Sequence, residues 1–159
     1  MNTPLAIDFA DFLAALENRN VKLTYYLDKQ TGEVVEHDRD DDNHEVTLDT
    51  DEPPPPSVSD LLLRFPDRYL PIAVFPQKDY FFTMRGFVKQ LPNGLSKTLL
   101  NKALDMPKPA MNFKQYLKRY PNESEHWYRY YDEKLQDFGE NWLKSNQIVF
   151  SWKESDEQN

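Results

Sequence analysis

Cysteine is missing from this sequence of 159 residues, glycine occurs four times and histidine three times. The lack of cysteine excludes disulfides, thiolate catalysis and zinc sites built on cysteine. The four glycines are widely scattered, so the chain has no glycine-rich loop of the kind that cradles phosphates. No apolar run reaches the roughly 18 residues that a transmembrane helix needs. We therefore expect neither a cofactor, nor a metal, nor a membrane partner.

The first 16 residues contain Asp8 and Asp11 but no basic residue. A secretory signal begins with a positively charged segment, so this composition argues against one. By elimination, the expected location is the cytoplasm.

Size and composition predict one folded domain. Hydrophobic residues make up 39% of the chain, which is low, but aromatic residues make up 14%. Large rings each bury much surface, so a compact core remains feasible. We expect a single domain over residues 1–152, an acidic, proline-rich flexible excursion at 38–57 and a disordered tail at 153–159.

Charge is distributed unevenly along the chain. Residues 36–52 hold nine acids and one base, which equals the net charge of −8 of the whole protein. Residues 78–119 hold nine bases and two acids. An acidic segment is therefore followed by a basic one.

Capping residues and apolar spacing predict most of the helices. Asp8 is a typical N-cap for a short amphipathic helix, and Ser96 is expected to cap another. Residues 78–91 predict a further helix with Phe81, Met84, Val88 and Leu91 on one side. Asn112 with Gln115 and Asn122 with Glu125 resemble capping boxes, so each pair predicts a helix start. The helix from Asn122 is expected to run to about residue 145.

Strand signals are fewer. Residues 23–27 and 34–37 flank a turn in which Gly32 can adopt a positive φ, so we predict a β-hairpin. Residues 68–72 and 148–152 are candidates for a third and a fourth strand. The predicted fold class is α+β, with a small antiparallel sheet around the hairpin packed against about five helices, the last of them long.

Several local patterns occur in an order typical of a known family. They are Tyr26–Val35, Arg68–Ile72, Phe113–Leu117, Trp127–Glu133, Trp142-Leu143 and Ile148. This order resembles the uncharacterised protein family 158 of the UPF series, small prokaryotic proteins of unknown function. The sequence departs from the pattern at residues 105–110 and at the tetraproline followed by residues 57–65. The resemblance implies an α+β fold and assigns no catalytic or binding residue.

The acidic segment is a candidate binding site for a basic protein partner. The residues that would contact it are Asp38, Asp40, Asp41, Asp42 and Glu45. Asp38, Asp40 and Asp42 also match the first positions of a calcium-binding loop, but Asn43 replaces the glycine that such a loop needs. The alternative is an ordinary solvated acidic loop.

The basic segment is a candidate anion-binding or nucleic-acid-binding surface. Lys78, Arg85 and Lys89 are spaced by seven and four residues, so they share one helix face, and Lys114 and Lys118 repeat the spacing of four. Side-by-side packing of the two helices would merge the stripes into one patch. The alternatives are ordinary solvated helix faces, or a basic surface that the acidic segment of the same chain screens.

Enzyme signatures are weak. No two histidines are spaced as metal ligands, and His126 at the start of the long helix is an isolated candidate for a general base. The sequence therefore favours a non-enzymatic binding or regulatory module that engages a protein partner through charged surfaces, as an antitoxin or immunity protein does. Nucleic-acid binding through residues 78–119 is the alternative, and a small enzyme ranks third. Oligomeric state and partner identity stay open.

Overall fold

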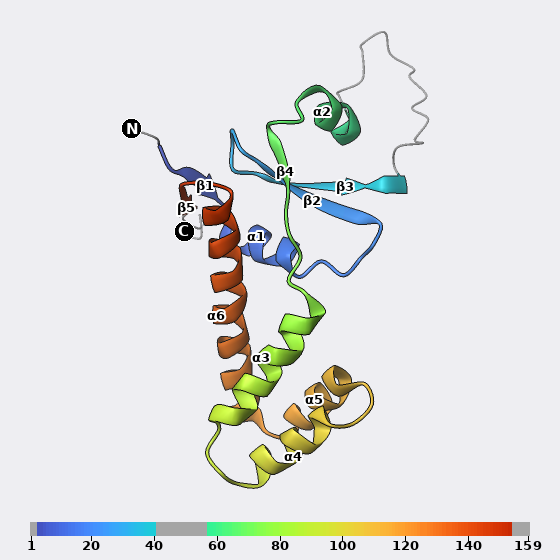
Figure 1. The fold of residues 1–159 in the computed structure, drawn as a ribbon, viewed down its shortest axis with the longest axis vertical. Coiled ribbons are helices and arrows are strands. Elements are labelled where there is room, and N and C mark those ends of the chain that lie inside the picture. Colours follow the sequence, from blue (N-terminus) through green and yellow to red (C-terminus); the bar gives the residue numbers. More distant parts are fainter. Residues whose placement is uncertain (1–2, 41–56, 154–159) are drawn as a thin grey trace, which may run out of the picture. The chain divides into compact units, whose positions relative to one another are not determined.

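The structure, a computed structural model, describes residues 3–40 and 57–153. These residues form six helices and five strands (Figure 1), so the predicted α+β class is confirmed. The chain divides into two compact units: unit 1 contains Met1–Val74 and Gly139–Asn159, and unit 2 contains Phe75–Phe138. Helix α6 contributes residues to both units, and the single domain expected over 1–152 stays a prediction. Most of the predicted acidic excursion and the predicted tail lie outside the described residues.

Unit 1 contains the predicted hairpin. Strands β2 (Leu23–Asp28) and β3 (Val34–Asp38) pair antiparallel, and β4 (Tyr69–Pro71) pairs antiparallel with the other edge of β2. The sheet order is therefore β3-β2-β4. Gly32 has a φ of 84°, a conformation that side chains disfavour. A Cβ atom at this position would also collide with the backbone oxygen of Ala6. Both the backbone conformation and the lack of space therefore require glycine here.

A second, two-stranded sheet joins distant parts of the chain. Strand β1 (Leu5–Ile7) pairs in parallel with β5 (Phe150–Trp152), and Leu5 lies opposite Phe150. The strand expected near residue 150 is therefore present, but it does not join the hairpin sheet. Its partner β1 was not predicted, because three residues carry too little periodicity to be recognised and parallel pairing leaves no local turn signal.

Helix α1 (Phe9–Leu16) starts as the sequence predicts. The Asp8 carboxylate accepts a hydrogen bond of 2.9 Å from the backbone N–H of Asp11. Phe12 and Leu16 are fully buried and approach Gly139 of α6, where a Cβ atom would lie under 3 Å from both side chains. A small residue in α6 therefore allows α1 to pack closely in unit 1.

Helix α2 (Val58–Arg64) has a reciprocal cap but no buried side chain. The hydroxyl of Ser57 accepts a hydrogen bond from the Asp60 N–H, and the Asp60 carboxylate accepts one from the Ser57 N–H. The helix contacts β3, where Ser59 and His37 form a hydrogen bond of 3.0 Å. The residues between α2 and β3 in the sequence are not among those described.

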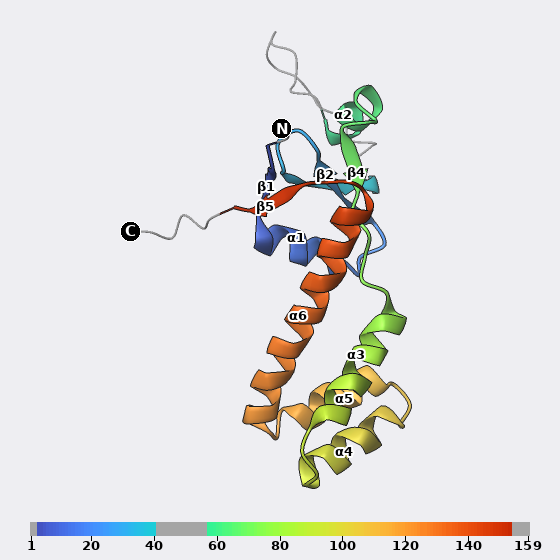
Figure 2. The same ribbon diagram turned by 60° about the vertical axis from the view of Figure 1, so that its left-hand side comes forward.

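Unit 2 is formed by helices alone: α3 (Gln77–Gln90), α4 (Leu95–Leu104), α5 (Pro109–Leu117) and the part of α6 (Pro121–Ser145) up to Phe138 (Figure 2). Its centre is aromatic. Trp127 of α6 lies 5.4 Å from Phe87 of α3 and 5.0 Å from Phe113 of α5, measured between ring centroids, and all three side chains are buried. Edge-to-face ring contacts therefore connect three helices in one core.

Three of the predicted helix starts are wrong in position. Helix α4 begins at Leu95 with Gly94 as its N-cap, so Ser96 lies inside the helix. Helix α5 begins at Pro109, and the Asn112 side chain donates to the carbonyl oxygen of Pro107 instead of capping a helix start. Helix α6 begins at Pro121, one residue before Asn122. Proline is favoured in the first turn of a helix, and this preference outweighed the cap pattern in α5 and α6.

Neither a membrane span nor a metal cluster occurs in the described part of the chain. No helix there is both long and apolar enough to cross a membrane. No three His, Asp or Glu side chains in residues 3–40 and 57–153 come together as metal ligands would.

Candidate interaction site on helix α3

One face of helix α3 is exposed and combines basic residues with an aromatic ring. At about 100° per residue, Lys78, Arg85 and Lys89 fall within about 40° of one another, and Phe82 lies beside them. All four residues are exposed, and Phe82 has 60% of its surface exposed. The opposite side of the helix holds the buried residues Thr83, Met84, Phe87 and Val88. The amphipathic pattern thus presents a charged and aromatic surface, which we call the α3 face.

Two neighbouring groups orient Arg85. Its Nη2 atom lies 2.7 Å from Oδ1 of Asp105, the C-cap residue of α4. Its guanidinium also lies 5.2 Å from the ring centroid of Phe81, which in turn lies 6.3 Å from the ring of Phe82. Because the Arg85 side chain is 45% exposed, the ion pair with Asp105 is solvated and contributes little to stability. Arg85 therefore remains available to a partner that offers a second carboxylate.

Buried rings pack behind the α3 face. Behind it, the fully buried Phe87 ring packs edge-on against Phe113 and Trp127. At the end of α3, the Lys97 ammonium donates hydrogen bonds of 3.1 Å to the carbonyl oxygens of Lys89 and Leu91. These contacts satisfy carbonyl groups that a helix end leaves without partners.

Lys114 and Lys118 of α5 do not extend the α3 face. Both are exposed, but the Lys114 ammonium lies 5.5 Å from the ring centroid of Tyr80 on α3. Tyr80 follows Lys78 by two residues, so its side chain points about 200° away around the helix. The structure therefore brings Lys78, Arg85 and Lys89 together, and places Lys114 at the opposite side of α3.

The division of charge coincides with the division into units. Unit 2 holds eleven bases and seven acids, a net charge of +4, and the rest of the chain holds eight bases and twenty acids, a net charge of −12. An acidic unit and a basic unit therefore occur in one protein.

The candidate acidic site is only partly described. Asp38 Oδ1 accepts a hydrogen bond of 2.9 Å from the Asp40 N–H, and the Asp40 carboxylate lies 3.2 Å from the Lys22 ammonium. Asp41, Asp42 and Glu45, together with the remainder of the calcium-loop pattern, lie outside the described residues.

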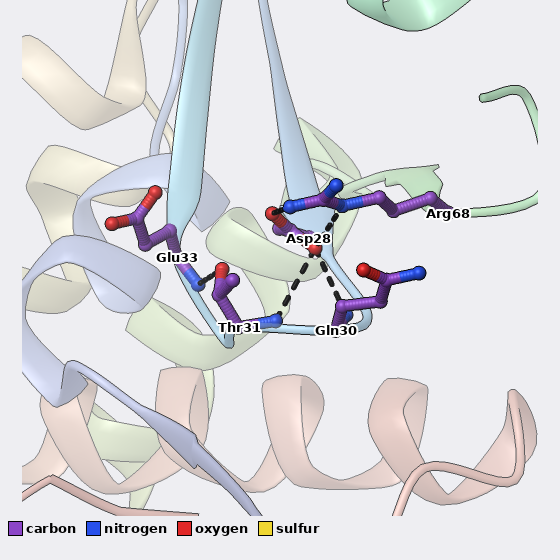
Figure 3. Close-up of polar contacts among 5 residues, drawn as sticks. All are labelled: Asp28, Gln30, Thr31, Glu33 and Arg68. Atoms are coloured by element: carbon purple, nitrogen blue, oxygen red, sulfur yellow. Dashed lines mark hydrogen bonds and ion pairs between the residues drawn. The ribbon is translucent and has the colours of Figure 1, made fainter. Parts of the chain in front are cut away.

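The hairpin turn is braced by an ion pair that sequence reasoning missed (Figure 3). Arg68 donates from Nε and Nη2 to the two carboxylate oxygens of Asp28, at 2.9 and 2.8 Å, and the N–H groups of Gln30 and Thr31 donate to Oδ1. Burial raises the pKa of Asp28, but the bonds from Arg68 and the two N–H groups outweigh it and lower the pKa to about 2. Both oxygens are used within the protein, so this cluster stabilises the turn and offers nothing to a ligand.

His126, the isolated candidate for a general base, lies against the aromatic core of unit 2. It is exposed, and its ring packs edge-on against Phe87 at 5.2 Å. The His126 ring therefore contributes to packing at the edge of the aromatic core.

A polar groove of about 510 Å³ lies beside the hairpin turn in unit 1. Residues 3–6, 29–31 and 146–149 line it, and Lys29 is its one charged lining residue. Gln147 adopts a left-handed conformation with φ 61° at its rim. Most of the lining residues are exposed, so the groove is an open depression with no enclosed chamber.

Sequence reasoning also missed Phe82. The helical spacing from Lys78 to Lys89 contains the signal, since Phe82 follows Lys78 by four residues and so falls on the same face.

Comparison with known proteins identifies a family, and no activity has been assigned to that family. The model of the Uncharacterised protein family (UPF0158) matches residues 2–159. A UPF0158 protein of Pseudomonas aeruginosa is 29% identical over 145 residues, which cover 91% of this chain and 86% of that protein. No solved structure matches the chain significantly.

Proposed function

The chain belongs to the uncharacterised protein family UPF0158, and we propose that it is a non-enzymatic binding protein that engages an acidic protein partner through the α3 face. The observation that carries this proposal is the exposed Phe82 ring among Lys78, Arg85 and Lys89. A partner that offers two or three carboxylates around an apolar side chain would match this surface in charge and in polarity.

The combination of charge and aromatic surface is typical of protein interfaces. Aromatic residues and arginine are enriched in such interfaces, and a ring that becomes fully desolvated on binding often dominates the affinity. Lysines at the rim mainly steer the encounter and set the choice of partner. Phe82 would supply the buried contact, and Lys78 and Lys89 would select an acidic surface around it.

The size of the α3 face favours a protein over a nucleic acid. Proteins that bind a nucleic-acid backbone typically contact about six to ten phosphates. The α3 face offers three cations, and Lys114 lies on the opposite side of α3. The chain as a whole carries a charge of −8, which repels a polyanion. Nucleic acid is therefore the second candidate, supported by the basic residues alone.

Affinity capture from a lysate of the source organism tests the proposal. The bait is the tagged full chain, used with and without nuclease treatment at low and high salt. The test variant is Lys78→Glu with Lys89→Glu, and the matched control is Lys102→Glu with Lys118→Glu, which makes the same charge change at exposed residues of α4 and at the end of α5.

The expected result is a protein retained in stoichiometric amount after nuclease, released by high salt and lost with the test variant alone. Retained material that disappears with nuclease would move the function to nucleic-acid binding. Equal retention by the test and control variants would refute a role for the α3 face.

A further inference from the structure

Strand β5 in unit 1 is paired along one edge only. The Leu5 N–H donates to the carbonyl oxygen of Val149 at 2.8 Å, and the Lys153 N–H donates to that of Ile7 at 2.7 Å. The odd-numbered residues of this stretch therefore direct their backbone groups to β1. In the described part of the chain, β5 has no strand on its other side.

The open edge carries the backbone groups of Phe150 and Trp152. Successive residues of a strand direct their N–H and C=O groups to opposite edges, and the neighbours of these two residues face β1. Their N–H and C=O groups therefore point away from β1, and residues 3–40 and 57–153 supply no backbone partner for them. A row of unpaired strand groups is a template for pairing with another strand.

The sequence leaves this edge unprotected. Natural edge strands are commonly shielded by charged side chains, by proline or by a covering helix. Residues 148–152 contain neither a charge nor a proline, and Val149 has 55% of its surface exposed. Helix α1 covers one face of the strand and not its edge, since the rings of Phe9 and Phe12 lie 4.9 and 5.9 Å from the Trp152 ring.

We propose that the open edge of β5 pairs antiparallel with β5 of a second copy of this chain, which joins the two small sheets into one sheet of four strands. The inference goes beyond the proposed function, because it uses unit 1 alone and does not involve the α3 face. The contact is isologous, so the same surface on both copies closes the pair.

The alternation of backbone groups determines the register. Hydrogen-bonded positions of an antiparallel pair must both face the partner, so Phe150 of one copy opposes Trp152 of the other. This register pairs the outward groups of both residues, and it sets Ser151 opposite Ser151 on the two-fold axis. Placing Phe150 opposite Phe150 would set Trp152 opposite Ile148, whose N–H already donates to Leu143.

Side chains and charge favour a second copy as the occupant. The register sets two aromatic rings opposite each other, and aromatic pairs across antiparallel strands are stabilising. Lys153 opposes the uncharged Val149, so the two lysines lie at opposite ends of the ladder, whereas parallel pairing would set them side by side. The strand therefore matches itself in hydrogen bonds, in rings and in charge.

The expected association is transient. Residues 149–153 form a ladder about 17 Å long, so the contact buries only a few hundred Å², and stable interfaces bury about 1,200 Å² or more. A suitable measurement must therefore detect a short-lived contact.

Disulfide trapping at position 151 detects such a contact, since the chain has no cysteine of its own. In the proposed register the two Ser151 residues form a non-hydrogen-bonded pair with Cα atoms about 4.5 Å apart, which a disulfide can bridge. The matched control is Ala6→Cys, at the exposed residue beside Ser151 on β1. The two Ala6 residues would lie three strand spacings apart, about 14 Å, which is too far for a disulfide.

Both variants of the full chain are oxidised under mild conditions and followed by non-reducing gel electrophoresis, after circular dichroism has shown that they fold. We expect Ser151→Cys to form a linked dimer at least roughly ten times faster than Ala6→Cys. Equal rates would overturn the inference, because random collisions would then explain both.

Charge at the two-fold axis gives a second, independent measurement. Ser151→Lys and Ser151→Glu each set like charges opposite one another, whereas a mixture of the two variants sets opposite charges there. In sedimentation velocity over a rising concentration series, the mixture should associate more strongly than either variant alone. A mixture that associates no more than its components would overturn the inference.

Discussion

Replacing Asp28 by asparagine should destabilise unit 1 by an amount that depends on pH. The carboxylate is 2% exposed and accepts four hydrogen bonds, which hold its pKa at about 2 against an ordinary value of 3.8. That difference corresponds to about 2.5 kcal/mol of folding free energy at neutral pH. Asparagine keeps the shape but removes the charge, and it leaves the Arg68 guanidinium without its partner.

The sign of the pH dependence follows from the lowered pKa. The stabilisation is fully present above the unfolded pKa of about 4 and is lost as the pH falls through about 2. The ionised carboxylate therefore contributes about 2.5 kcal/mol at pH 7, about 1.3 kcal/mol at pH 3 and under 0.5 kcal/mol at pH 2. The difference between the wild type and Asp28→Asn should shrink in the same proportion.

Urea unfolding followed by circular dichroism at pH 7, 3 and 2 measures this difference. Asp67→Asn is the matched control, because Asp67 is an exposed carboxylate next to Arg68 in the sequence. The reasoning would be refuted if Asp28→Asn cost less than about 0.5 kcal/mol at pH 7, or if its cost were the same at all three pH values.

Three further substitutions test the fold. Gly32→Ala should lower the melting temperature through a loss of about 1–3 kcal/mol or more, because φ is 84° and the new Cβ atom would collide with the backbone of Ala6; an unchanged melting temperature would contradict this. Phe87→Ala should cost about 3–5 kcal/mol in urea unfolding, since the ring is fully buried among other rings; a cost under 1 kcal/mol would show that this core is not packed as described. Lys97→Met should cost about 1 kcal/mol and speed amide hydrogen exchange in the last turn of α3, where its ammonium holds two carbonyl groups; exchange at the wild-type rate would argue against that cap.

Local signals predicted the elements that form locally. The Asp8 cap places the start of α1, and the turn around Gly32 places the hairpin, because each depends on residues within a few positions of one another. The long apolar stripe likewise predicts α6 to Ser145. Helix starts failed where two local signals competed, as at Pro109 against Asn112.

Features that depend on contacts between residues far apart in the sequence could not be predicted from it. The parallel pairing of β1 with β5 joins residues more than 140 positions apart, and the Asp28–Arg68 ion pair joins residues 40 positions apart. Whether the α3 and α5 lysines form one patch was likewise left open until Lys114 was found against Tyr80.

The sequence alone determined the α+β class, the family, the hairpin and the alignment of Lys78, Arg85 and Lys89, because composition, turn chemistry and helical periodicity are properties of neighbouring residues. Tertiary structure decided which of these residues are exposed together. In unit 2 the buried side of α3 contacts Phe113 of α5 and Trp127 of α6 through Phe87, and Phe82 lies on the other side of the helix, where 60% of its surface is exposed. Burial depends on which elements pack against which, and that choice is made by the whole chain at once.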